Sequence, residues 1–258
     1  MNINFIKNNI VFGTNELNNK AKNYCFGRNR LAKDTLELST KDITTEKVSS
    51  LPECPKIDAI KQSQYYNTYN YIPAGTKILD GFLDPGGNGT ISDDGNAFSP
   101  REVIYINRKE DKTLTKMIND FTGFATLANE EKRANFLKTI VQYLSNETDE
   151  NILKNCDNLP ENEKILLGDV IDRNAAVCRH QALLYKIIGD EGGLNVSVVR
   201  GVMDNGRHAW NVVYLDNGKK LLIDTTNGIK QDITDLPEDG EIIYIDKNNE
   251  EHKYEPFK

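Results

Sequence analysis

The sequence predicts an α+β fold in which a helix carrying a cysteine packs on an antiparallel sheet. Residues 178–193 have the spacing of a helix that ends at two glycines. Its apolar stripe consists of Leu183, Leu184, Ile187 and Ile188. Three strand-like segments follow, separated by two Asp-Asn-Gly turns, and they are residues 194–203, 208–215 and 219–226. One helix followed by three strands joined by short turns predicts an antiparallel meander.

Composition narrows the class of protein. The 258 residues are 38% hydrophobic and carry a net charge of −7, which allows a sizeable core and argues against binding nucleic acid by neutralising phosphates. No apolar run approaches the roughly 20 residues of a membrane helix, and the first residues lack the apolar region of a secretory signal. We therefore expect a cytoplasmic protein with no membrane span and no nucleic-acid partner.

The chain divides, on this view, into two regions. Residues 1–125 are expected to be helical and rich in loops, and to pack on a catalytic core formed by residues 126–258. Glycine, proline and aspartate crowd residues 73–100, which predicts a long ordered loop or a linker. The substrate-binding walls are expected to come from the first region.

Three further elements are predicted between the turn-rich segment and the cysteine helix. β-branched and aromatic residues favour a strand at 102–107, and the spacing of 114–121 favours a helix. A clearer helix is predicted at 129–144, with two acidic residues in its first turn. Its apolar stripe would contain Phe136, Leu137, Ile140, Val141 and Leu144.

A cysteine, a histidine and an aspartate follow one another along the predicted core in an order that suits nucleophilic catalysis. Cys178 opens its helix, where unpaired backbone N–H groups and the helix dipole stabilise a thiolate. A nucleophilic cysteine needs a base within reach, and the base needs an acceptor that orients it. His208 opens the second strand of the meander and Asp224 lies near the end of the third, so they are the candidates for these roles.

This pairing requires a particular turn. Side chains alternate between the two faces of a strand, so a two-residue turn at Asn217-Gly218 would place His208 and Asp224 on opposite faces. A three-residue loop of Asp216, Asn217 and Gly218 would place them on one face. We therefore predict that Leu215 and Lys219 flank the loop and that Gly218 has positive φ.

The segments AAVCRHQALLYKIIGDEGG, RHAWNVV and LLIDTT resemble the transglutaminase-like superfamily of papain-like thiol enzymes. Residues 164–228 are particularly similar to the transglutaminase-like domain of plant ethylene-response-type kinases. The resemblance implies a papain-like core with Cys178 as nucleophile, His208 as general base and acid, and Asp224 as the residue that orients His208. Bacterial members of this superfamily include secreted effectors, and the Asn-, Lys- and Ile-rich composition fits an AT-rich genome. The resemblance therefore implies a bacterial effector that a dedicated secretion system delivers to a host cell.

Other candidates have weaker support. The backbone N–H of Cys178 is the natural first donor of an oxyanion hole, and Asn174 is the nearest upstream amide that could be the second. His180 points away from Cys178 on a helix, which favours a structural role. No C-x-x-C pair is present, which argues against a zinc ribbon or a thioredoxin-like motif. No metal or cofactor is expected. The remaining cysteines, which are expected to be structural or incidental, are Cys25, Cys54 and Cys156.

The predicted function is thiol-dependent acyl transfer on an amide of a protein substrate. Glutamine deamidation or transglutamination through a Cys178 thioester is the favoured form. Peptide-bond hydrolysis shares every step and stays open as an alternative. A second alternative is a non-catalytic interaction module that keeps the fold.

Overall fold

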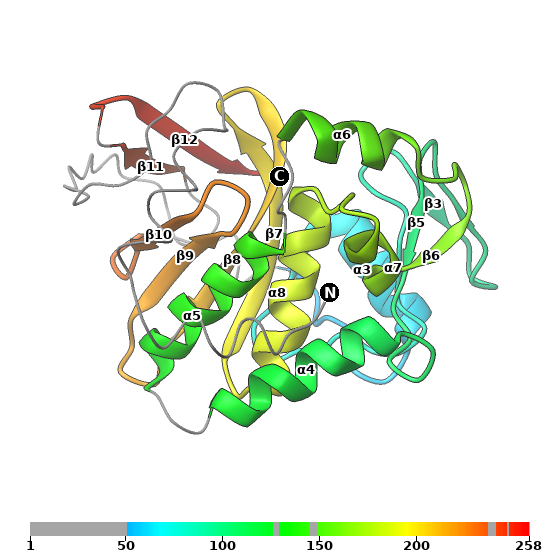
Figure 1. Ribbon diagram of the computed structural model, residues 1–258, viewed down its shortest axis with the longest axis horizontal. Coiled ribbons are helices and arrows are strands. Elements are labelled where there is room, and N and C mark those ends of the chain that lie inside the picture. The colour runs from blue at the N-terminus through cyan, green and yellow to red at the C-terminus, as the bar shows by residue number, and fades with distance from the viewer. Residues whose placement is uncertain (1–50, 126–128, 145–148, 237–240, 247, 258) are drawn as a thin grey trace.

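A computed structural model describes residues 51–125, 129–144, 149–236, 241–246 and 248–257. Helix α8 (Cys178–Glu191) and the strands β7 (Asn195–Met203), β8 (Gly206–Tyr214) and β9 (Lys220–Asp224) follow one another as predicted. The three strands pair antiparallel in sequence order. The α+β class and the meander are therefore confirmed, and Figure 1 shows α8 lying along these strands.

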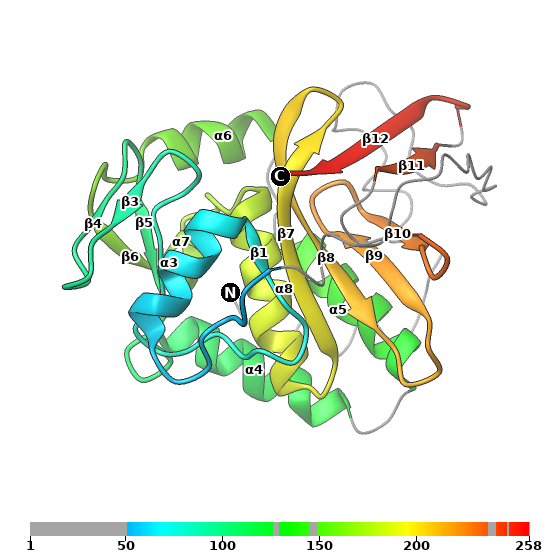
Figure 2. The ribbon, with the colours of Figure 1, turned by 180° about the vertical axis from the view of Figure 1, so that it is seen from behind.

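The main sheet extends beyond the meander on both sides. Its order is β10-β9-β8-β7-β12-β11, with β1 as a further partner of β7. The added strands were not predicted, and they are β1 (Tyr71–Ile72), β10 (Ile229–Asp232), β11 (Ile242–Ile245) and β12 (Glu251–Pro256). Figure 2 shows the C-terminal end of β12 meeting one end of β7, where Tyr254–Pro256 pair with Gly201–Met203. The last described residues of the chain are therefore part of this sheet.

The described residues also form two smaller sheets, mostly from segments before residue 125. β5 (Val103–Tyr105) confirms the strand predicted at 102–107, and it pairs antiparallel with β2 (Leu83–Asp84) and parallel with β6 (Lys164–Leu166). The other is a hairpin of β3 (Thr90–Ile91) and β4 (Ala97–Phe98) within the turn-rich segment. The parallel pairing joins residues before and after the proposed boundary at 125.

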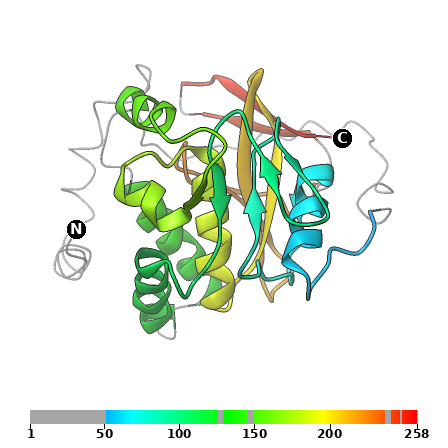
Figure 3. The same ribbon diagram turned by 90° about the vertical axis from the view of Figure 1, so that its right-hand side faces the viewer.

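Helices cover the sheet. The predicted helices are present as α4 (Lys112–Ala125) and α5 (Glu130–Tyr143), and α5 begins at Asn129, whose side chain accepts the Lys132 N–H. Both helices contact α8. Three more helices were not predicted: α3 (Ala59–Tyr69), α6 (Asp149–Asp157) and α7 (Leu167–Asp172). Figure 3 shows the green helices gathered on one side of the long yellow and red strands. None of the helices in the described ranges is long and apolar enough to cross a membrane.

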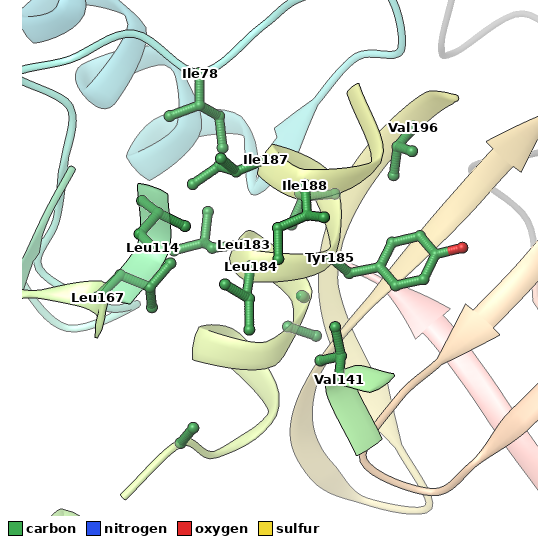
Figure 4. Close-up of a cluster of buried hydrophobic side chains, with 14 of the residues drawn as sticks. Ile78, Leu114, Val141, Leu167, Leu183, Leu184, Tyr185, Ile187, Ile188 and Val196 are labelled. Atoms are coloured by element: carbon green, nitrogen blue, oxygen red, sulfur yellow. The ribbon is translucent and has the colours of Figure 1, made fainter. Parts of the chain in front are cut away.

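One large hydrophobic core surrounds α8. Leu183, Leu184, Ile187 and Ile188 are at most 1% exposed, as their stripe predicts. Figure 4 shows them between side chains from other elements of the chain: Ile78, Leu114, Val141, Leu167 and Val196. A second cluster lies around Trp210 and Tyr254 and includes residues of β8, β9, β10, β11 and β12. The first cluster fixes α8 against the sheet, and the second packs beside the end of β8 that carries His208.

Candidate active site

Cys178 is the first residue of α8 and is half-buried. Val177 precedes it in an extended conformation, so the helix begins at Cys178. Burial raises the pKa of the Cys178 thiol, but a hydrogen bond and the charge of His208, with a hydrogen bond from the Ala209 N–H, lower it more. The net result is a pKa below the ordinary value of a thiol, which is the direction that a nucleophile needs.

The hairpin between β8 and β9 has the predicted three-residue loop. The Leu215 N–H donates to the Lys219 carbonyl at 2.9 Å, and the Gly218 N–H donates to the Leu215 carbonyl at 2.9 Å. Gly218 has a φ of +85°. Asn211 pairs with Ile223, so His208 and Asp224 share one face of the hairpin. The prediction that their side chains meet is confirmed, because His208 Nε2 lies 2.7 Å from Asp224 Oδ2.

The Asp224 carboxylate is completely buried and accepts hydrogen bonds on both oxygens. Oδ2 accepts from Asn227 Nδ2 at 2.7 Å and from Tyr254 Oη at 2.8 Å, in addition to its contact with His208. Oδ1 accepts from the backbone N–H groups of Thr226 and Asn227. Burial raises the pKa of this carboxyl, but the charge of His208 and these hydrogen bonds lower it to about 2. Asp224 therefore carries a full negative charge at neutral pH.

His208 lies between this carboxylate and the thiol. Burial lowers the pKa of its imidazole, whereas the charge and hydrogen bond of Asp224 and the contact with Cys178 raise it well above the ordinary value. Trp210 stacks near the imidazole with a centroid distance of 6.3 Å, and the Tyr254 ring is tilted against it at 6.1 Å. The shifts of His208 and Cys178 act in the same sense, toward an imidazolium beside a thiolate.

His180 holds a structural position, as the sequence favours. It has no exposed surface; its Nδ1 accepts the Val177 N–H at 3.1 Å and its Nε2 lies 2.9 Å from Glu102 Oε1. Burial lowers the pKa of His180 to about 4, so the ring is neutral. The ring thus ties the first turn of α8 to the start of β5.

Glu102, Cys156 and His180 lie close enough to suggest a metal site. Their chemistry does not fit one. His180 Nδ1 accepts a hydrogen bond, so the proton of the neutral ring is on Nε2, the atom that faces Glu102. Arg179 pairs with the Glu102 carboxylate, and Arg101 donates to the Cys156 sulfur. The ligand atoms are already committed to protons and guanidinium groups.

A glycine-rich loop borders the site. Asp84, the residue at the start of this loop, is completely buried and pairs with Arg200. Its Oδ1 also lies 3.7 Å from Arg179 Nη1. Beyond the glycines, Asn88 Oδ1 accepts from Arg207 Nη1 at 2.6 Å. Arg179 follows Cys178 and Arg207 precedes His208, so the loop contacts the neighbours of both residues.

The glycines allow this close approach. A Cβ on Gly86 would lie 2.9 Å from Arg179 Nη1, and one on Gly87 would lie 3.2 Å from Arg207 Nη1. Gly86 also has a φ of +75°. The turn-rich segment of the sequence is therefore an ordered loop that forms part of the candidate site.

The other predicted site residue is placed elsewhere. Asn174 lies in the turn before α8 with a φ of 52°, and its carbonyl accepts from Asn155 Nδ2 at 3.3 Å. Within the described ranges, no hydrogen bond joins its side chain to Cys178 or His208, and its oxyanion role stays a prediction. Cys54 and Cys156 are buried, and burial raises the pKa of each thiol to about 11. Cys25 lies outside the described residues.

Sequence reasoning missed Asn227 and Tyr254. Asn227 follows Asp224 by three residues and closes a turn around it, a local pattern that the Asp-Thr-Thr-Asn run could have indicated. Tyr254 comes from β12, and no periodicity in its strand signals a contact with a residue 30 positions earlier.

Comparisons with known proteins agree with the predicted link to plant kinases. A family model described as EDR1/CTR1/ARMC3, peptidase-like, matches residues 58–228. A curated protein of Arabidopsis thaliana, named probable serine/threonine-protein kinase SIS8, is 24% identical over 223 residues. That alignment covers 67% of this chain and 21% of the plant protein, so the chain spans about a fifth of the length of that relative. No solved structure matches the chain significantly.

Proposed function

Because the chain belongs to the EDR1/CTR1/ARMC3 peptidase-like family, we propose that its Cys178, His208 and Asp224 form a catalytic triad for acyl transfer on a protein amide. The observation that carries this proposal is the 2.7 Å contact between His208 Nε2 and a buried, ionised Asp224. It fixes the imidazole in the orientation and charge state that stabilise a thiolate at the start of α8.

The reaction proceeds in two acyl transfers. The Cys178 thiolate attacks the carbonyl carbon of the amide, and the carbonyl electrons move to the oxygen. When the C–N bond breaks, the His208 imidazolium gives its proton to the leaving nitrogen, and a thioester remains. Neutral His208 then takes a proton from water or from a second amine as this attacks the thioester, and the thiolate is regenerated.

Two substrate forms fit this sequence of steps. A peptide bond would make the protein a cysteine peptidase, which the name of the family favours. A glutamine side chain would make it a deamidase, or a transglutaminase when an amine replaces water. We keep the glutamine form as the proposal, with a papain-like core as its scaffold. Delivery into a host cell remains a prediction from the resemblance to a superfamily with bacterial effectors.

Selective alkylation tests the nucleophile without a known substrate. At pH 6, a thiol with a pKa of about 11 is ionised in about one molecule in 10⁵, so Cys54 and Cys156 should be inert. Iodoacetamide should therefore modify Cys178 at least 100-fold faster than either, as peptide mapping by mass spectrometry would measure. His208→Ala should abolish this preference, whereas His252→Ala, a control at a buried histidine outside the candidate triad, should retain it.

Cys178→Ala separates catalysis from folding. It should remove all amidase, deamidase and crosslinking activity while the far-UV spectrum stays unchanged, because the side chain at this half-buried helix start contributes little packing. If Cys178 reacts no faster than Cys54 and Cys156, the chain is better described as a non-catalytic interaction module.

A further inference from the structure

The last described strand of the chain reaches the candidate triad. β12 lies beyond the segment that matches the family, and it carries Tyr254, which has no exposed surface. The Tyr254 hydroxyl donates to Asp224 Oδ2 at 2.8 Å, and this is the oxygen that faces His208 Nε2. One oxygen therefore joins the phenol to the imidazole.

The position of Tyr254 is fixed by more than its hydroxyl. Its ring meets Trp210 edge-on with a centroid distance of 5.2 Å and lies against the His208 imidazole. β12 approaches β7 at Gly201, which pairs with both Pro256 and His208. A Cβ on Gly201 would come within 2.1 Å of the Glu255 carbonyl oxygen. The seat for β12 is thus formed by a residue that directly faces the histidine.

We propose that Tyr254 is a positioning residue that limits the negative charge presented by Asp224 to His208. A phenol that donates a hydrogen bond to a carboxylate makes the carboxylate less basic, because each donor stabilises the charged form. The imidazolium beside such a carboxylate gives up its proton more readily than it would beside an unshared charge. This proposal rests on the proposed function, since His208 must release a proton to the leaving nitrogen.

Charged and titratable groups surround both His208 and Tyr254. Cys178 on α8 and Asp224 on β9 face His208. Asp224, Asp204 and Tyr244 are the ionisable groups that act on Tyr254. His208 is thus the group whose titration reports the charge on Asp224 most directly.

The test is the titration of His208 in the full chain, followed by NMR of ¹³Cε1-labelled histidine. The sequence has three histidines, and substitution of each assigns the signals. Tyr254→Phe keeps the ring and removes the hydroxyl, so the pKa of His208 should rise, with a shift of at least half a pH unit in the midpoint. Tyr105→Phe removes a hydroxyl that accepts from Asn107 Nδ2 near β5, and it should leave the midpoint unchanged. Thermal melts establish that each variant is folded.

A second variant keeps the proposal testable if Tyr254→Phe does not fold. 3-Fluorotyrosine at position 254 has a more acidic hydroxyl and donates a stronger hydrogen bond, so the His208 midpoint should fall. A midpoint that stays in place in both variants, or that moves opposite to these directions, would overturn the proposal. Alkylation of Cys178 in the unaltered protein is read separately. If Cys178 is unreactive the proposed catalysis fails, whereas an unmoved His208 titration removes only the role of Tyr254.

Discussion

Asp224 is a charged residue without any exposed surface, and its environment explains why it stays ionised. Burying a carboxylate is costly unless its charge is paired and its oxygens accept hydrogen bonds. Asp224 faces His208, and both of its oxygens accept from nearby donors, two of which are backbone N–H groups. Removing the carboxylate would leave these donors without their buried acceptor.

The first residue-scale prediction concerns Asp224→Ala. At pH 7 the variant should lose about 3–5 kcal/mol of unfolding free energy, because a buried pair loses one partner. Catalytic activity should fall less than in Cys178→Ala, since an orienting residue is the least essential member of a triad. Urea denaturation measures the stability, and iodoacetamide labelling of Cys178 measures the remaining activation of the thiol.

The pH dependence of that difference follows from the pKa of Asp224. The folded value of about 2 lies below the ordinary value, so the stabilisation is complete above the ordinary value and is lost as the pH falls toward 2. The stability gap between the native protein and Asp224→Ala should shrink by about 2 kcal/mol between pH 5 and pH 2. If the stability gap does not change over this range, the contacts of Asp224 do not lower the pKa of its carboxyl in the folded protein.

A second residue-scale prediction separates the role of His180 from that of His208. His180→Ala should lower the unfolding free energy by about 1–3 kcal/mol, because the Val177 N–H and Glu102 lose a buried partner. The preference of iodoacetamide for Cys178 at pH 6 should persist, since His208 is untouched. Loss of that preference with an intact fold would give His180 a part in activating the thiol.

At the scale of elements, the β8–β9 loop determines whether the triad can form. Gly218 takes a φ of +85°, and a Cβ added there would meet no atom within 4 Å. The cost of Gly218→Ala is therefore backbone strain alone, about 1–2 kcal/mol. Gly218→Asn should cost less, because asparagine tolerates this conformation. Urea denaturation compares the two variants, and Cys178 labelling should be unchanged in both. An equal loss in the two would show that φ at this position is not the cause.

The elements that could be predicted are those with clear local patterns. The stripe of α8, the two Asp-Asn-Gly turns and the alternation of faces were sufficient to place Cys178, His208 and Asp224 near one another. α3 was missed because it lacks an aliphatic stripe and buries Gln62 and Ser63 beside Tyr65 and Tyr66. β12 was missed because its sequence, Glu251–Pro256, is mostly polar and buries His252 and Tyr254 through contacts with distant strands.

At the scale of the whole molecule, long-range contacts tie the N-terminal part to the sheet. Asp84 pairs with Arg200, which lies 116 residues away and also stacks over the Tyr66 ring at 3.8 Å. β1 pairs with β7, and β5 pairs with β6. No local sequence pattern specifies such partners, so a linker could not be distinguished from an ordered loop at residues 73–100.

These contacts lead to the last prediction, which concerns the proposed division at residue 125. The large core includes nine buried residues from before it, and the burial of an aliphatic or aromatic side chain contributes about 1.5–3 kcal/mol. A domain is stable by only about 5–15 kcal/mol, so the loss of nine such side chains is as large as that margin or larger. They are Tyr66, Ile72, Ile78, Phe82, Ile104, Ile106, Leu114, Met117 and Phe121.

The fragment 126–258 should therefore lack a cooperative thermal transition and bind a hydrophobic dye, and its Cys178 should react like an ordinary thiol. The fragment 51–258 should melt cooperatively and keep the selective labelling of Cys178. A cooperative melt of 126–258 would show that this segment folds independently, because its packing would then suffice without the β1, β5 and α4 contacts.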